Sequence, residues 1–191
     1  MTQIKALIEG WTNADCEKLG QKPTTACTIS LIRDKGIIAL VDPGELPSQQ
    51  VLIDALKREN LTKEDITHIF QTHYHVDHTR NTGLFPENVK VVNEFGVWQE
   101  GADEDLEFPN NYSENIKIIL TPGHSHDGLS FAVKTDRGLV VICGDVFWKK
   151  DFPKFDQYAA DMTELEKSRK KVLQIADYII PGHGNIFKVK K

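Results

Sequence analysis

The sequence predicts an α/β fold in which two β-rich halves are each followed by helical segments. Short apolar runs of strand length recur along the chain, and residues 48–59 and 162–176 carry the apolar spacing of helices. No repeat, linker or low-complexity stretch interrupts the 191 residues, and 40% of them are hydrophobic, which is enough for one sizeable core. We therefore expect a single domain that spans residues 1–191.

In the first half, apolar runs predict strands at residues 4–9, 27–32 and 37–41, and a polar stretch, 13–24, joins the first two. Ser48 is expected to cap a helix that ends near Glu59. The inner face of this helix would carry Val51, Leu52, Ala55 and Leu56. A further strand is expected at residues 66–70, and a second helix is expected to begin near Asn81 or Glu94.

The second half again consists of expected strands and a helix. Strands are expected at residues 89–92, 116–120, 130–133, 139–143 and 178–180. Residues 162–176 form the clearest helical pattern of the chain and lie between the last two of these strands.

The most informative motif follows the strand expected at 66–70. His73, His75, Asp77 and His78 lie within six residues, and residues two apart on a strand point to the same face, which would align His73 with His75. Asp77 and His78 follow where the chain must turn. Imidazole nitrogens could hold one metal ion here, while a carboxylate and an imidazole could hold a second. Burying so many polar groups without partners would be costly, so a purely structural cluster is disfavoured.

Three more candidate ligands each follow an apolar strand and lie among glycines or prolines. His124 follows the strand at 116–120, Asp145 follows the strand at 139–143, and His183 follows the strand at 178–180. Loops at one sheet edge can converge on a common site. His68, by contrast, lies inside a strand and is expected to be structural, and Cys143 is expected in the core.

The motif His73-x-His75-x-Asp77-His78, followed in order by His124, Asp145 and His183, resembles the metallo-β-lactamase superfamily. This resemblance implies an αββα sandwich, with two mixed sheets flanked by helices. It also implies that His73, His75 and His124 bind a first metal, that Asp77, His78 and His183 bind a second, and that Asp145 bridges the two. An aspartate at this bridging position is typical of the glyoxalase, lactonase and nuclease branches.

The implied activity is that of a di-zinc hydrolase with two Zn²⁺ per chain, with iron or manganese as alternatives. A metal-bridging hydroxide would attack the substrate, because metal binding lowers the pKa of water to roughly 7. Asp77 would orient this nucleophile as the catalytic residue. Asp42 is expected either to support the ligand loop or to cap the turn before Ser48. His126 is expected to contact substrate, to protonate a leaving group, or simply to be exposed.

Cleavage of phosphodiesters in RNA or single-stranded DNA is the leading hypothesis for the substrate. Hydrolysis of a carboxylic ester, thioester, lactone or β-lactam is the alternative, since the same nucleophile serves both reactions. A mononuclear iron dioxygenase acting on persulfides is a second alternative, because it uses a similar set of ligands.

Charge is unevenly distributed along the chain. Residues 1–148 hold 13 Lys and Arg against 22 Asp and Glu, whereas residues 149–191 hold 10 against 6. The basic end offers a candidate nucleic-acid surface formed by Lys167, Arg169, Lys170 and Lys171. A solvated helix face is the alternative reading of these four residues.

Location in the cytoplasm is expected, without a membrane partner. No apolar run approaches the ~18 residues of a membrane span, and the first ten residues are too polar for a signal peptide. The three cysteines show no spacing typical of a disulfide framework. Oligomeric state stays open.

Overall fold

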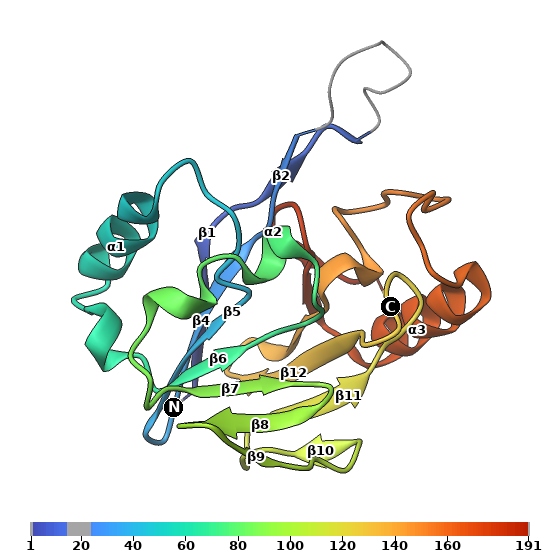
Figure 1. The fold of residues 1–191 in the computed structure, drawn as a ribbon. Helices are drawn as coiled ribbons and strands as arrows, with labels where there is room; N and C mark the ends of the chain where they lie inside the picture. Colours follow the sequence, from blue (N-terminus) through green and yellow to red (C-terminus); the bar gives the residue numbers. More distant parts are fainter. Residues whose placement is uncertain (1, 15–23, 191) are drawn as a thin grey trace.

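The computed structural model describes residues 2–14 and 24–190. Two sheets pack face to face with a helix on each outer side (Figure 1), which confirms the predicted αββα sandwich. The predicted loop at 13–24 lies largely outside the described residues.

The first sheet has seven strands in the order β1-β4-β5-β6-β7-β8-β9. The strands β5, β6 and β7 are parallel to one another and the other pairs are antiparallel, so the sheet is mixed as expected. Its strands are β1 (Gln3–Ile8), β4 (Ile29–Asp34), β5 (Ile37–Val41), β6 (His68–Phe70), β7 (Lys90–Asn93), β8 (Gly96–Gln99) and β9 (Ala102–Glu104).

The second sheet has six strands in the order β10-β11-β12-β13-β14-β15, and only β13 and β14 are parallel. Its strands are β10 (Asn110–Asn111), β11 (Ile116–Leu120), β12 (Leu129–Thr135), β13 (Gly138–Ile142), β14 (Tyr178–Ile180) and β15 (Phe187–Lys188). A separate two-stranded ribbon pairs β2 (Trp11–Thr12) with β3 (Thr25–Ala26).

Three helices and three short 3₁₀ turns complete the described structure. The helices are α1 (Gln49–Arg58), α2 (Val76–Thr79) and α3 (Met162–Ile175), and the turns are η2 (Lys63–Asp65), η3 (Thr82–Leu84) and η4 (Gly144–Val146). None of these helices has the length and apolar character that a membrane span would need.

Neighbouring residues on a strand face opposite sides of the sheet, and this arrangement forms the layers of the core. Phe70 of β6 stacks on Phe131 of β12 between the sheets, with ring centroids 4.8 Å apart. Its neighbour Ile69 faces the other way and packs with Leu52 and Leu56 of α1. Leu165 and Val172 of α3 cover the outer face of the second sheet in the same manner. Strands buried on both faces leave only the loops at the strand ends free to carry a site.

The second helix is expected to begin near Asn81 or Glu94, and the Glu94 alternative is wrong. Asn93 pairs with Gly96 at the end of β7 and β8, so Glu94 lies in the turn of a hairpin. Near Asn81 the structure has the four-residue helix α2 just before this position and the 3₁₀ turn η3 just after it. Ser48 does occupy the N-cap position of α1, although its side chain forms no capping hydrogen bond.

Candidate metal centre

The loop between β6 and α2 supplies the first candidate ligands. His73 and His75 lie in this loop and not on the strand, so the predicted strand alternation does not apply to them. They converge nevertheless, with 3.1 Å between Nε2 of His73 and Nδ1 of His75. Asp77 and His78 follow within α2, where His78 is fully buried and the Asp77 side chain is 23% exposed.

Three other loops bring the remaining candidates to the same place. His124 follows β11, Asp145 lies in η4 directly after β13, and His183 follows β14. Gly182 makes room for this convergence, because a Cβ at that position would lie only 1.9 Å from Oδ1 of Asp145. A glycine before His183 is therefore required by the carboxylate of Asp145.

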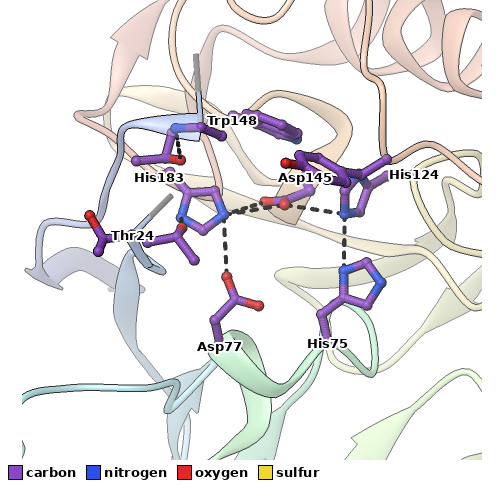
Figure 2. Close-up of a pocket in the computed structure, with 11 residues that line it drawn as sticks. Thr24, His75, Asp77, His124, Asp145, Trp148 and His183 are labelled. Atoms are coloured by element: carbon purple, nitrogen blue, oxygen red, sulfur yellow. Dashed lines mark hydrogen bonds and ion pairs between the residues drawn. The ribbon is translucent and has the colours of Figure 1, made fainter. Parts of the chain in front are cut away.

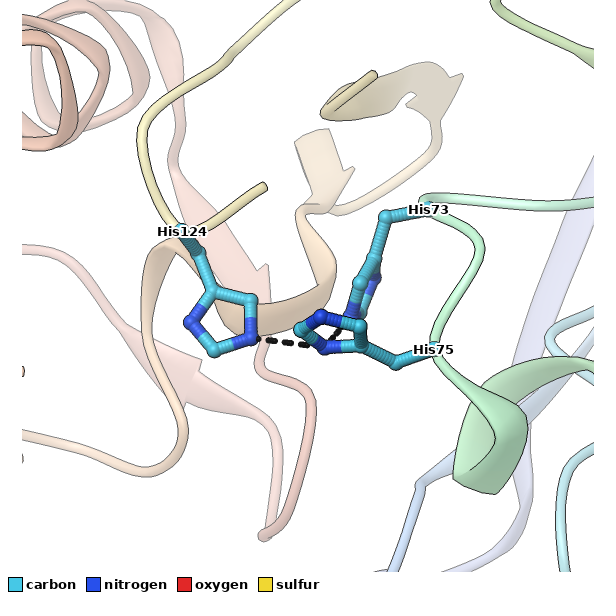
Figure 3. Close-up of side chains that lie close together, drawn as sticks. All are labelled: His73, His75 and His124. Atoms are coloured by element: carbon cyan, nitrogen blue, oxygen red, sulfur yellow. Dashed lines mark hydrogen bonds between the residues drawn. The ribbon is translucent and has the colours of Figure 1, made fainter. Parts of the chain in front are cut away.

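His73, His75 and His124 form the first group (Figure 3). Nδ1 of His75 lies 3.1 Å from Nε2 of His73 and 3.0 Å from Nε2 of His124. A ring nitrogen carries either one proton or one lone pair, so a hydrogen bond can satisfy only one of these two contacts. A metal ion can accept all three nitrogens at once, and these atoms all lie within 4.8 Å of one another.

Asp77, His78 and His183 form the second group. Oδ2 of Asp77 lies 3.8 Å from Nε2 of His78 and 3.7 Å from Nε2 of His183. These three atoms also lie close enough together to hold one ion.

Asp145 lies between the two groups (Figure 2). Its Oδ2 is 3.3 Å from Nε2 of His124 in the first group. Its Oδ1 is 3.4 Å from Nε2 of His78 and 3.2 Å from Nε2 of His183 in the second. A single carboxylate can therefore contact both groups.

Asp42 orients two of the imidazoles, that of His78 directly and that of His73 through Thr72. Its Oδ2 accepts a hydrogen bond from Nδ1 of His78 at 2.9 Å and another from the hydroxyl of Thr72 at 2.7 Å. The Thr72 oxygen in turn accepts from Nδ1 of His73 at 3.0 Å. Asp42 has a positive φ of 53°, which aspartate tolerates better than most residues and which turns the chain after β5. Of its two predicted roles, support of the ligand loop is the one observed.

Two further contacts orient His124 and His183. Nδ1 of His124 donates to Oδ2 of Asp156 at 2.7 Å, and Nδ1 of His183 donates to the carbonyl oxygen of Ala26 at 3.0 Å. With the proton on Nδ1, each of these imidazoles presents a lone pair on Nε2 toward the centre. Such outer hydrogen bonds are the usual means of fixing the tautomer of a histidine that binds metal.

Two orphaned atoms show how well the pocket suits a cation. Nε2 of His78 and Oδ1 of Asp145 are buried, and although they lie 3.4 Å apart, neither forms a hydrogen bond with a described residue. Leaving such atoms unsatisfied in the interior is costly, and a metal ion would complete both. The donor set of imidazoles and carboxylates suits zinc, iron or manganese.

The pKa shifts of Asp145 and His78 also favour a cation in this pocket. Burial raises the pKa of Asp145, but the nearby histidines, led by His183 and His78, outweigh burial and hold this pKa well below its ordinary value. Burial also lowers the pKa of His78, yet Asp145, Cys27 and Asp42 together outweigh it and raise this pKa well above its ordinary value. The centre therefore favours a positive charge beside Asp145, which a proton or a metal ion can supply.

A cavity of about 390 Å³ opens onto both groups. His75, Asp77, His124, Asp145 and His183 line it together with Thr12, Ala14, Thr24, Thr25, Trp148 and Tyr158. Trp148 and Tyr158 stack on each other with ring centroids 5.8 Å apart, and Trp148 meets His124 edge to face. A small substrate in this cavity would lie between these rings and the candidate ligands.

Several other predicted residues lie elsewhere. His126 is exposed and is not among the residues that line the cavity. His68 packs edge to face against Phe70 and Tyr112, as expected for a structural histidine. Cys143 is buried in the core beside α3, also as expected.

The predicted basic face of α3 needs correction. Arg169 is buried, and it anchors α3 to η4 and to the segment that follows, because it donates from Nε to the carbonyl oxygen of Val146 and from Nη1 to that of Lys154. Lys167, Lys170 and Lys171 are exposed, but they do not line the cavity at the histidines. Arg169 therefore cannot belong to a nucleic-acid surface.

Asp156 is the main residue of the centre that the sequence does not reveal. It is buried beneath His124, on the irregular segment between η4 and α3. This segment has no apolar periodicity that would place it, although an acidic residue within reach of a candidate ligand is the kind of partner that metal-binding histidines need.

Comparison with known proteins identifies the family of the chain. Residues 23–94 match the family model of the metallo-beta-lactamase superfamily. The chain is 32% identical over 196 residues to metallo-beta-lactamase domain-containing protein 1 of Xenopus laevis, a match that covers 98% of this chain and 82% of the relative.

Solved structures share the fold. A candidate metallo-beta-lactamase of Thermotoga maritima superposes with a TM-score of 0.74 at 24% identity, covering 98% of this chain and 99% of the other. A dizinc quorum-quenching lactonase, solved with a product, superposes with a TM-score of 0.65 at 17% identity, covering 88% of this chain and 76% of the other. The chain belongs to the metallo-beta-lactamase superfamily and is a metal-dependent hydrolase.

Proposed function

We propose that the chain is a dinuclear metallo-hydrolase that cleaves phosphodiester bonds in RNA or single-stranded DNA. The position of Asp145 is the observation that carries the dinuclear assignment, because its two oxygens lie 3.3 Å and 3.4 Å from histidines of the two separate groups. A bridging carboxylate at this spacing serves two adjacent ions better than one.

His73, His75 and His124 would hold the first ion, and Asp77, His78 and His183 the second. When bound, such ions polarise the scissile group and acidify a water molecule. Zinc fits the nitrogen-rich first group best, while the second group, with its carboxylate, also suits iron or manganese.

Residues of the chain would orient the attacking water, hold the imidazoles in place and limit how the substrate enters. Asp77 is the only candidate ligand in α2 that is partly open to the cavity, so its carboxylate can accept a hydrogen bond from the attacking water and orient it. Asp42 and Asp156 hold the imidazoles in one tautomer and one orientation. Trp148 and Tyr158 form one wall of the cavity, which would limit the ways in which a substrate can enter.

Hydrolysis of a lactone or another carboxylic ester is the second candidate. The ring pair of Trp148 and Tyr158 would suit an apolar acyl group, and the structurally similar dizinc protein is a quorum-quenching lactonase. A phosphodiester is preferred because a second hollow, lined by Lys149, Lys150 and Lys188, adjoins the cavity.

A substrate panel tests this proposal. Metal-loaded protein is incubated with labelled RNA, labelled single-stranded DNA, a small lactone and a chromogenic cephalosporin, and a His183→Ala variant serves as the control for contaminating enzymes. We expect cleavage of RNA or single-stranded DNA that the variant lacks. Turnover confined to the lactone or the cephalosporin would replace the proposal with the second candidate.

A further inference from the structure

A second hollow of about 690 Å³ lies beside the cavity and shares Thr12 and His183 with it. The ribbon strand β2, the segment at Lys149 and Lys150, and residues 183–188 line this hollow, which we name the lysine groove. Hydrogen bonds from Thr28 to Gly182 and from His183 to Ala26 tie these distant parts of the chain together. The groove therefore leads directly to the candidate metal ligand His183.

Charge in the lysine groove is positive although the chain as a whole carries −5. Lys149, Lys150 and Lys188 line it, against the single carboxylate of Glu9. Within residues 2–14 and 24–190, none of the three lysines forms an ion pair, although Nζ of Lys149 lies 4.4 Å above the ring of Phe152. Unpaired ammonium groups along one path favour a ligand with several negative charges.

Trp11 adds an aromatic surface to the same groove. It lies on β2, where its backbone pairs with Ala26, and its side chain is 50% exposed. An exposed indole beside ammonium groups is the combination by which proteins hold single-stranded nucleic acids, since an unpaired base can stack on the ring while its phosphates meet the cations. Bases within a duplex are already stacked and could not use it.

We propose that the lysine groove binds single-stranded nucleic acid and leads it to the metal centre, with Lys150 and Lys188 contacting phosphates and Trp11 stacking on a base. The inference rests on the proposed phosphodiesterase function and names the surface that would hold its substrate. It replaces the face of α3, whose Arg169 is buried and whose three lysines line neither the cavity nor the groove.

Binding of a cleavage-resistant probe tests the proposal without relying on turnover. The probe is a fluorescein-labelled 2′-O-methyl phosphorothioate oligouridylate of about ten nucleotides, within the usual site size of such grooves. Fluorescence anisotropy is measured over a series of salt concentrations for metal-loaded wild type, Lys150→Gln/Lys188→Gln and Trp11→Ala. The matched control is Lys167→Gln/Lys170→Gln, which removes two exposed charges from α3.

The groove variants should lose affinity and the control should not. Removing two phosphate contacts should flatten the slope of log K against log salt by about 1.4, because each contact on a single strand contributes about 0.7. Trp11→Ala should weaken binding by about 5- to 150-fold, the usual range for loss of one stacked base. Trp11→Phe should keep most of the affinity that Trp11→Ala loses. Binding of a polyglutamate of similar charge should not depend on Trp11.

Three results would overturn the inference: wild type that does not bind the oligonucleotide, groove variants that bind as the α3 control does, or equal loss of polyglutamate binding in Trp11→Ala. Hydrolysis of bis(p-nitrophenyl) phosphate, which needs only the metal centre, is measured in parallel. Its absence in wild type would count against the proposed function, whatever the binding data show about the groove.

Discussion

Asp156 accepts a hydrogen bond from Nδ1 of His124 at 2.7 Å, although the two residues are 32 positions apart. Its other oxygen accepts from the backbone N–H of Tyr158 at 2.9 Å, so the carboxylate is held from both sides. This contact fixes which nitrogen of His124 faces the centre.

Asp156→Asn should weaken binding of the ion held by the first group by about 10- to 100-fold, the usual cost of losing such an outer partner. The amide cannot accept hydrogen bonds on both sides, so His124 loses its fixed tautomer. Competition with a chelator measures the affinity. Asp151→Asn, which makes the same change at an exposed position of the same segment, should leave it unchanged. Equal affinities in wild type and Asp156→Asn would remove Asp156 from the metal centre.

Gly182→Ala should displace the carboxylate of Asp145. The added Cβ would lie 1.9 Å from Oδ1 of Asp145, and the backbone of Gly182 does not have the positive φ that would strain an alanine. We expect at least one ion per chain to be lost while the melting temperature of the chelated protein changes little. Gly83→Ala is the matched control, since a Cβ there meets nothing within 4 Å. Full metal content in Gly182→Ala would show that Asp145 does not bridge.

Asp77→Ala should reduce turnover by ~10²-fold or more, because its carboxylate positions the attacking water. The side chain is not part of a core cluster, so the fold should persist. Turnover, metal content and melting temperature are measured on the same preparation. Activity within a few-fold of wild type at full metal content would exclude the catalytic role of Asp77.

His68 should make the protein less stable in mild acid. Burial, assisted by Lys90, lowers the pKa of His68 to about 4 from 6.5. The unfolded chain therefore takes up a proton near pH 6.5 while the folded chain does not, and the stabilising effect, complete above pH 6.5, is lost as pH falls toward 4. His68→Phe keeps a ring beside Phe70 and Tyr112 but cannot titrate.

The free energy of unfolding, measured at pH 7 and pH 5 in denaturant, should accordingly fall less in His68→Phe than in wild type. Both proteins are chelated so that the metal ligands contribute equally. The same pH dependence in both would mean that His68 is protonated as easily in the folded state as in the unfolded chain.

The sequence predicts the layers and the candidate ligands well because their signals are local. Strands such as β5 and β11 are continuous apolar runs bounded by turn residues, and each candidate ligand comes directly after such a run or within one motif. The hairpin of β8 and β9 is missed because every residue of β9 is exposed, so no hydrophobic alternation marks it.

Contacts between distant segments are what the sequence does not contain. Arg169 belongs to a helix whose charges look like a solvated face, and only the packing of α3 on η4 and on the segment after it shows that this residue is buried. Asp156 and the carbonyl oxygen of Ala26 reach their histidines in the same way, across 32 and 157 positions. Such pairs depend on the fold and not on local spacing.

Metal content per chain tests the central claim most directly. Inductively coupled plasma mass spectrometry on purified protein should give close to two ions per chain in wild type. His183→Ala should hold close to one, because it removes a ligand of the second group and leaves His73, His75 and His124 intact. One ion per chain in wild type, unchanged in His183→Ala, would contradict the dinuclear centre, and a single iron would favour the dioxygenase alternative.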